Sequence, residues 1–242
     1  GDHRDLHGTS HSFPTRRLPI YTDFLASLPH NGHTMMLWTL STHTASRRYE
    51  DKTGTMEERI EAARRLQEAG YTIRFKLKPI IPHLGWREET TQMFETLYSR
   101  VKPDNLSMEM VFVDSVAELD ETMGKDTLEP AFVAAAEQAE AERGACWQHA
   151  VDGEKPFPFA VKEEVYRHVI AESRRLSPET PITLCAETQR MWEALADLLD
   201  GNPWNYPCNC GPHCTPQRRQ IEQVGGPDAE RIARAAASGA IG

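Results

Sequence analysis

The chain has 242 residues, with 27 Lys and Arg against 36 Asp and Glu, so its formal net charge is −9 at neutral pH. Hydrophobic residues make up 39% and charged residues 26% of the sequence, a balance that is typical of soluble globular proteins and excludes collagen-like and disordered chains. The sequence holds no uncharged apolar run of the roughly 18 to 20 residues that a bilayer crossing needs, and its first residues lack a signal-peptide pattern. We therefore expect a cytoplasmic protein that does not contact membranes.

The first 33 residues are rich in histidine and show neither the period of a helix nor that of a strand. His3, His7 and His11 are four residues apart, a spacing that would place three imidazoles on one helix face as potential metal ligands. Gly8 interrupts this spacing and no apolar stripe accompanies it, which favours a polar loop. We expect residues 1–33 to form an irregular leading segment.

A strand, a helix and a second strand follow in order. Residues 34–40 form a nearly continuous apolar run, the pattern of a strand that is buried on both faces of a parallel sheet. After a polar loop, Thr55 and Glu58 predict a capping box at the start of a helix that ends at Gly70. Residues 71–77 alternate between apolar and polar side chains and predict the second strand. The short connections indicate a parallel crossover.

The same alternation of strands and helices continues through residue 200. We expect helices at 88–101, 118–123, 129–143, 162–176 and 188–199, strands at 106–112 and 181–185, and an irregular insert at 144–160. A complete eightfold barrel has about 250 residues and eight strand–helix units. Four strands predict an α/β fold over residues 34–200, a partial (β/α) barrel with about four units and a parallel sheet. Residues 201–242 then form a Cys-containing carboxyl-terminal extension and tail.

Polar residues follow the predicted strands at the ends where parallel α/β folds bind ligands. The hydroxyls of Thr39, Ser41 and Thr42 suit hydrogen bonding to a ribose or a carboxylate. Further along the chain, Cys185 and Glu187 follow the last predicted strand. We therefore regard this edge of the sheet as the candidate site.

Two strands carry charged residues at positions where a buried strand would be apolar. Lys76 and Lys78 alternate with apolar neighbours, which indicates either a strand at the sheet edge or a lysine that faces a ligand. Glu109 lies between methionines, and burying a carboxylate without a partner costs several kcal/mol. This carboxylate is either a functional group in the barrel interior or one half of a buried bridge to a lysine such as Lys76.

Three of the five cysteines, Cys208, Cys210 and Cys214, lie close together with His213 among them. An odd number of cysteines argues against a secreted disulfide framework. Three thiolates and an imidazole form the ligand set of a structural zinc site or an iron–sulfur cluster, although the spacing is not that of a standard zinc finger. The alternative is a set of thiols that binds no metal.

Several motifs occur together in a familiar order. They are Trp38-Thr-Leu-Ser-Thr42, Gly54-Thr55, Glu58-Arg-Ile-Glu-Ala-Ala63, Pro79-Ile-Ile-Pro-His-Leu-Gly-Trp86, Leu106-Ser-Met-Glu-Met110 and Thr183-Leu-Cys-Ala-Glu-Thr188. This order resembles the carboxyl-terminal part of the radical-SAM barrel in the spore photoproduct lyase family and its DNA-repair-photolyase-like relatives. The resemblance extends from about residue 34 to residue 214.

The resemblance implies a partial barrel that holds a [4Fe–4S] cluster and S-adenosylmethionine, reductively cleaves the latter to a 5′-deoxyadenosyl radical, and abstracts hydrogen from a substrate. In the founding members of the family that substrate is a thymine dimer in DNA. By position, Thr39, Ser41 and Thr42 match the strand end that contacts S-adenosylmethionine. Lys76 and Glu109 would face the barrel interior as further cofactor-binding residues.

The family binds its cluster through C-x3-C-x2-C, a motif that this sequence lacks. We therefore expect a fragment or one part of a split protein, inactive by itself, whose cluster comes from a missing amino-terminal barrel half or from a partner chain. Such a half-barrel would expose an apolar strand edge on its amino-terminal side.

The alternative is a non-catalytic half-barrel that binds nucleic acid or a protein partner, with the cysteine triplet as a structural metal site. The arginine pairs at 16–17 and 47–48 would then contact phosphates, and binding would weaken steeply with salt. A third interpretation is a small zinc protein that shares only the barrel pattern.

Overall fold

The structure is a computed structural model that describes residues 18–50, 53–143, 155–202 and 206. Within these ranges, four parallel strands form one sheet in the order β1-β2-β3-β4, namely Met35–Thr39, Thr72–Ile80, Asn105–Met110 and Ile182–Leu184. Each strand pairs with its neighbours in the chain, which is how a (β/α) barrel is wound. The expected α/β fold with four parallel strands is confirmed.

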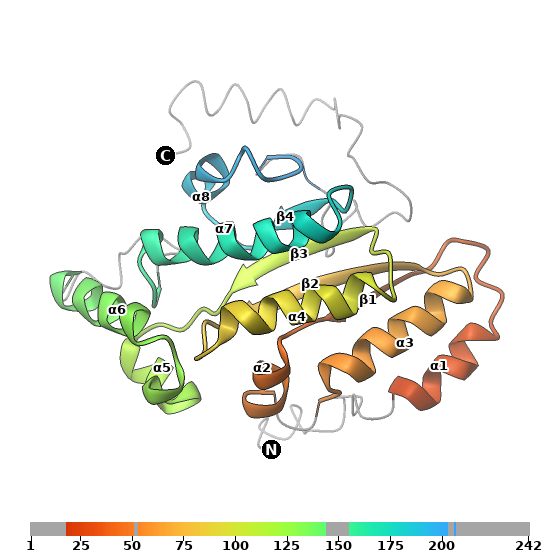
Figure 1. Cartoon of the computed structure of the whole chain (residues 1–242), viewed down its shortest axis with the longest axis horizontal. Helices are drawn as coiled ribbons and strands as arrows, with labels where there is room; N and C mark the ends of the chain where they lie inside the picture. Colours follow the sequence, from red (N-terminus) through yellow and green to blue (C-terminus); the bar gives the residue numbers. More distant parts are fainter. Residues whose placement is uncertain (1–17, 51–52, 144–154, 203–205, 207–242) are drawn as a thin grey trace, which may run out of the picture.

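One helix precedes the sheet, and helices follow every strand of it within the described ranges. They are α1 (Leu18–Ala26), α2 (His43–Arg48), α3 (Met56–Glu68), α4 (Trp86–Tyr98), α5 (Val116–Met123), α6 (Pro130–Arg143), α7 (Phe159–Leu176) and α8 (Gln189–Ala194), with a single 3-10 turn at Lys125–Thr127. Helices α4 and α7 lie side by side across one face of the sheet, and α3 continues this layer next to α4 (Figure 1).

The register between the strands aligns their side chains into rows, because successive residues of a strand point to opposite faces. The apolar row consists of Trp38, Phe75, Leu106 and Ile182, all at most 6% exposed. The polar row, one residue further along, consists of Thr39, Lys76, Ser107 and Thr183. The apolar row shares its buried core with side chains of α3, α4 and α7, so the opposite face is the polar one.

The capping box predicted at the start of α3 is confirmed. Thr55 Oγ1 accepts a hydrogen bond from Glu58 N at 3.2 Å, and Glu58 Oε2 accepts one from Thr55 N at 2.8 Å. Gly70 lies just beyond the helix with a φ of 90°, a conformation that glycine adopts without a steric penalty. These local signals set the boundaries of α3.

Residues 1–33 contain a helix that the sequence pattern did not predict. Helix α1 lies inside the segment that we expected to be irregular, and residues 1–17 lie outside the described residues. The Tyr71 hydroxyl donates a hydrogen bond to Leu25 O at 2.6 Å, and the His30 ring stacks on Tyr71 with a centroid distance of 3.8 Å. Contacts with residues far along the chain therefore hold α1, so local periodicity could not reveal it.

The apolar run predicted a strand that is buried on both faces. In the structure, β1 is partly exposed. Among the described strands it pairs with β2 alone, and Leu37 is 37% exposed. Phe24 on α1 is 62% exposed. Exposed apolar groups at this side agree with the expectation for a half-barrel edge.

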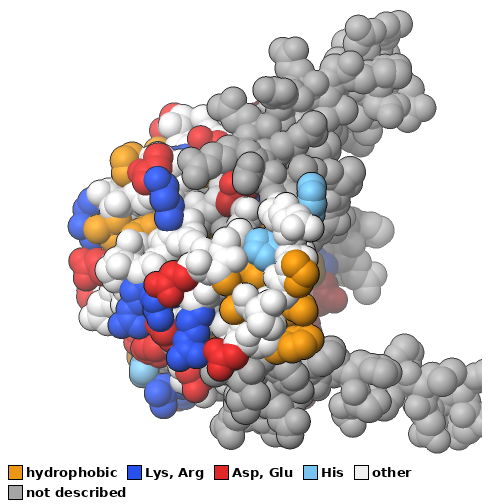
Figure 2. Space-filling view, turned by 90° about the vertical axis from the view of Figure 1, so that its right-hand side faces the viewer, with side chains coloured by type: hydrophobic (Ala, Val, Ile, Leu, Met, Phe, Trp, Pro, Cys, Tyr) orange, Lys and Arg blue, Asp and Glu red, His pale blue; other side chains and the backbone are white. Residues whose placement is uncertain are grey.

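Figure 2 views the molecule from the side of α1 and α3 and shows acidic and basic side chains interleaved beside a hydrophobic patch. On α3, Arg64 Nη2 lies 2.7 Å from Glu61 Oε1, and Arg65 Nη1 lies 3.5 Å from Asp23 Oδ1. Paired charges of both signs are typical of a solvated helix face. The candidate site therefore has to be sought at another side, where the strands end.

Candidate functional site at the carboxyl ends of the strands

Three strands bring ionisable side chains together at their carboxyl ends. Lys78 Nζ on β2 lies 2.5 Å from Glu109 Oε2 on β3, and the Glu109 side chain is 15% exposed. Leu184 pairs with Met108, so the next residue, Cys185, lies beside Glu109 on the adjacent strand, and the charges of Glu109, Lys76 and Lys78 act on its thiol. We call Lys76, Lys78, Glu109 and Cys185 the strand-end cluster.

Glu109 pairs with Lys78, whereas the sequence suggested a bridge to a lysine such as Lys76. The register explains the difference: Leu77 pairs with Met108, but Ile80 pairs with Met110. Strand β2 therefore has one extra residue at this point, which is the geometry of a β-bulge. The bulge brings Lys78 opposite Glu109, and no local pattern in the sequence marks it.

Lys76 lies in the polar row between Thr39 and Ser107. The interpretation of its strand as a sheet edge is wrong, because β2 lies between β1 and β3. The half-buried Lys76 therefore remains a candidate for facing a ligand on the polar face.

The Cys185 thiol is half-buried, and burial raises its pKa above the ordinary value. The Glu109 carboxylate raises the pKa further, whereas the charges of Lys76 and Lys78 lower it. The net direction is upward, so at neutral pH the group is a neutral thiol rather than a thiolate.

The predicted hydroxyls at the end of β1 belong to a network around Arg59, whose side chain is 3% exposed. Ser41 Oγ donates a hydrogen bond to Glu50, and Glu50 forms an ion pair with Arg59. Arg59 Nη1 donates to Thr39 O at 3.2 Å and to Thr39 Oγ1 at 3.3 Å. Thr39 itself is exposed. The sequence analysis did not identify Glu50 and Arg59 as members of this network. The one signal in the sequence was Arg59 itself, a charged residue next to the apolar stripe of α3.

Thr42 contacts a second network that the sequence did not reveal. His83 is 1% exposed, and its Nδ1 lies 2.8 Å from Leu84 O, so this nitrogen carries the donated proton. The other nitrogen, Nε2, lies 2.7 Å from Thr42 Oγ1 and 3.6 Å from Glu89 Oε2. Glu89 also accepts from Thr44 N at 2.8 Å. These bonds fix the loop that contains the predicted Ser41 and Thr42.

A small cavity of about 20 Å³ lies between the end of β1, the end of β2 and α4, with Ser41, Thr42 and Thr90 among its lining residues. This volume is close to that of one buried water molecule. The cavity is too small for a cofactor.

The described residues do not provide an iron–sulfur site. No group of three or more His, Cys, Asp or Glu side chains is arranged around a possible metal position in the described part of the chain. Cys208, Cys210 and Cys214, the predicted metal ligands, lie outside the described residues, as does the start of the predicted insert at 144–160. Within the described ranges, no helix combines the length and apolarity of a membrane span.

Sequential parallel strands, covering helices and a polar cluster at the carboxyl edge define an α/β protein of the (β/α) barrel type with its candidate site at the strand ends. Residues 16–118 match the family model of spore photoproduct lyase. The chain is 32% identical over 84 residues to the spore photoproduct lyase of Bacillus subtilis, and 29% identical over 87 residues to that of Geobacillus sp.. The sequence-based resemblance to this radical-SAM family is confirmed.

The matches cover parts of longer proteins. The alignments span 35% and 36% of this chain but 25% and 26% of the two curated relatives, so the chain spans about a quarter of their length. A solved spore photoproduct lyase mutant aligns over 69% of this chain and 48% of its own, with a TM-score of 0.50 and 19% identity. Another, complexed with dinucleoside spore photoproduct, has a TM-score of 0.48 and 18% identity over 68% of this chain and 47% of its own. The structural likeness concerns the fold.

The strand-end cluster predicts opposite shifts for two substitutions. Replacing Glu109 by Gln removes a negative charge that opposes thiolate formation, so the pKa of Cys185 should fall. Replacing Lys78 by Met removes a charge that favours the thiolate, so the pKa should rise. The pH dependence of Cys185 alkylation, followed by mass spectrometry of its peptide, measures both. Shifts in the same direction would contradict the cluster.

Proposed function

We propose that this chain supplies the binding face of a radical-SAM lyase that resembles spore photoproduct lyase and repairs a DNA lesion. The observation that carries the proposal is the polar row of a parallel sheet leading into the strand-end cluster. Three of the four strands that build this face lie within the segment that matches the family model. Ligands bind at this edge in parallel α/β folds.

In this proposal, Thr39, Ser41 and Thr42 bind S-adenosylmethionine, and Lys76 and Glu109 face the bound molecules. Thr39 is exposed, although its hydroxyl also accepts a hydrogen bond from Arg59, whereas Ser41 is bonded to Glu50 and Thr42 to His83. The latter two residues would therefore act mainly by shaping the loop. The [4Fe–4S] cluster does not fit the described residues, so we propose that a missing amino-terminal barrel half or a partner chain supplies it.

Replacing Thr39 by Ala tests the S-adenosylmethionine site. We expect about fivefold weaker binding, the equivalent of one lost hydrogen bond. Equilibrium dialysis of the full chain with S-adenosylmethionine measures the affinity. Thr122→Ala, an exposed threonine on α5, is the control and should bind as the unsubstituted chain does. Equal affinity of the two variants would contradict the role of Thr39.

Exposed apolar side chains at the strand ends offer a surface for the DNA lesion. Phe112, after β3, is 50% exposed, and Leu84, after β2, is 54% exposed. An exposed aromatic ring suits an unstacked base, because stacking contributes about 1–3 kcal/mol per base.

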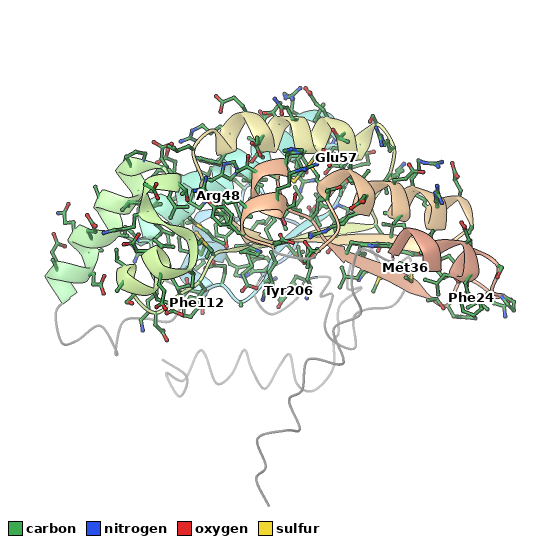
Figure 3. All side chains as sticks on the ribbon, turned by 90° about the horizontal axis from the view of Figure 1, so that it is seen from below. Phe24, Met36, Arg48, Glu57, Phe112 and Tyr206 are labelled. Atoms are coloured by element: carbon green, nitrogen blue, oxygen red, sulfur yellow. The ribbon has the colours of Figure 1, made fainter. Side chains whose placement is uncertain are left out.

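Replacing Phe112 by Ala should weaken binding of a single-stranded oligonucleotide that contains the spore photoproduct by roughly fivefold to a hundredfold. Fluorescence anisotropy measures the affinity. Phe24→Ala is a matched control, because Phe24 is equally available to solvent but lies near the opposite end of the molecule (Figure 3). If both variants bind alike, stacking at Phe112 is excluded.

A non-catalytic half-barrel that binds nucleic acid is a second candidate, and the exposure of Arg47 and Arg48 at the end of α2 favours it. Binding would then depend on these arginines and on salt, with no effect of bound S-adenosylmethionine. An oligonucleotide affinity that depends on the presence of the lesion favours the lyase. An affinity that depends on the salt concentration alone favours the non-catalytic half-barrel.

We further propose that Cys208, Cys210 and Cys214 hold an auxiliary iron–sulfur cluster or zinc. Replacing all three by Ala should abolish the bound metal, because thiolates are the ligands that both centres prefer. Metal and sulfide analysis of anaerobically purified, reconstituted protein measures this. Iron with sulfide identifies a cluster and zinc a structural site; metal retained in the variant would contradict the assignment.

A further inference from the structure

A buried group of three side chains anchors the loop that carries Cys185. Lys162 and Tyr166 lie one turn apart on α7, and both contact Glu187, which follows β4. Lys162 Nζ lies 2.5 Å from Glu187 Oε1, with the two side chains 5% and 2% exposed. The Tyr166 hydroxyl donates to the same oxygen at 2.6 Å. These distances describe charge-assisted bonds in an environment that excludes water.

The Tyr166 hydroxyl also connects two strand ends. It accepts a hydrogen bond from Met110 N at 2.8 Å, and Met110 is the last residue of β3. Met110 directly follows Glu109, and Glu187 comes two residues after Cys185. The Tyr166 hydroxyl therefore fixes the chain next to Glu109 on one strand and close to Cys185 on the other.

The turn between Cys185 and Glu187 requires such an anchor. Ala186 has a φ of 52°, a left-handed conformation that is disfavoured for a residue with a Cβ atom. Such a conformation persists where the surrounding structure holds it. On one side Cys185 N donates to Met108 O at 2.8 Å, and on the other side Glu187 is held by Lys162 and Tyr166.

We propose that Lys162, Tyr166 and Glu187 are positioning residues, which hold the Cys185 thiol against Glu109, Lys76 and Lys78. The inference deepens the proposed function, because the strand-end cluster is the proposed site. The positioning can be measured without S-adenosylmethionine or DNA, so its failure and that of the proposed function are distinguishable.

A purely stabilising role is the competing explanation, and two observations speak against it. A buried ion pair contributes little net stability, since desolvation offsets the attraction between the charges. In addition, Glu187 Oε2 is buried and has no hydrogen-bond partner among the described residues. A carboxylate that is left half satisfied is a poor stabilising element, but it can still fix the geometry of a loop.

Tyr166→Phe tests the proposal by removing one oxygen atom. In the unsubstituted chain, burial and Glu109 raise the pKa of Cys185, whereas Lys76 and Lys78 lower it. Without the hydroxyl the turn at Ala186 should relax and the thiol should gain contact with water. We expect the midpoint of Cys185 alkylation by iodoacetamide to move to lower pH, with severalfold faster reaction near pH 8. Mass spectrometry of the Cys185 peptide separates this thiol from the other cysteines.

Tyr98→Phe is the matched control. Tyr98 on α4 also contacts α7, through a hydroxyl 2.5 Å from Ser173 Oγ, and burial raises its pKa to about 12. The same atom is therefore removed from a tyrosine that packs on the same helix but does not reach the turn at Ala186. We expect this variant to leave the alkylation midpoint of Cys185 unchanged.

An unchanged midpoint in Tyr166→Phe, or an equal shift in Tyr98→Phe, would overturn the proposal in favour of general loss of stability. If Tyr166→Phe does not fold, Glu187→Gln replaces it. That variant keeps the shape of the side chain but removes the charge that strengthens both bonds. A smaller shift in the same direction supports positioning, and the absence of any shift overturns it.

Discussion

The register of the parallel sheet is the constraint on which the candidate site depends. Trp38, Phe75 and Leu106 align in the apolar row, and burying such a side chain contributes about 1.5–3 kcal/mol. A slip of one residue in β2 would turn Phe75 to the polar face and Lys76 into the core beneath the helices. The polar chemistry of one face is thus positioned by the hydrophobic burial of the other.

The polar face is made possible by ion pairs at both ends of the strands. At the amino ends, Arg74 Nε lies 2.7 Å from Asp104 Oδ2, with the two side chains 0% and 9% exposed. At the carboxyl ends, Glu109 is paired with Lys78. A buried pair such as Arg74 and Asp104 adds little net stability, because the cost of desolvating the charges offsets their attraction; the Lys78 side chain of the second pair is 44% exposed. Their role is to let charged groups remain inside a sheet that its apolar face stabilises.

The sequence was sufficient where the signal was local and failed where a contact was distant. The start of α3 could be predicted because the capping box involves residues three apart, and the parallel order follows from short connections. Helix α1 depends on Tyr71, and the network of Ser41 depends on Arg59 of α3. The bulge that pairs Lys78 with Glu109 depends on a neighbouring strand. The polar residues of the site could therefore be listed from the sequence, but their partners could not.

The protonation state of the described thiol bears on what it can bind. Metal ligation requires a thiolate, because the deprotonated sulfur is the ligand. Burial and the Glu109 carboxylate raise the pKa of Cys185 and favour the neutral thiol instead. Without a metal ion, Cys185 is therefore suited to hydrogen bonding within the strand-end cluster. This agrees with the proposal that the described sheet positions bound molecules.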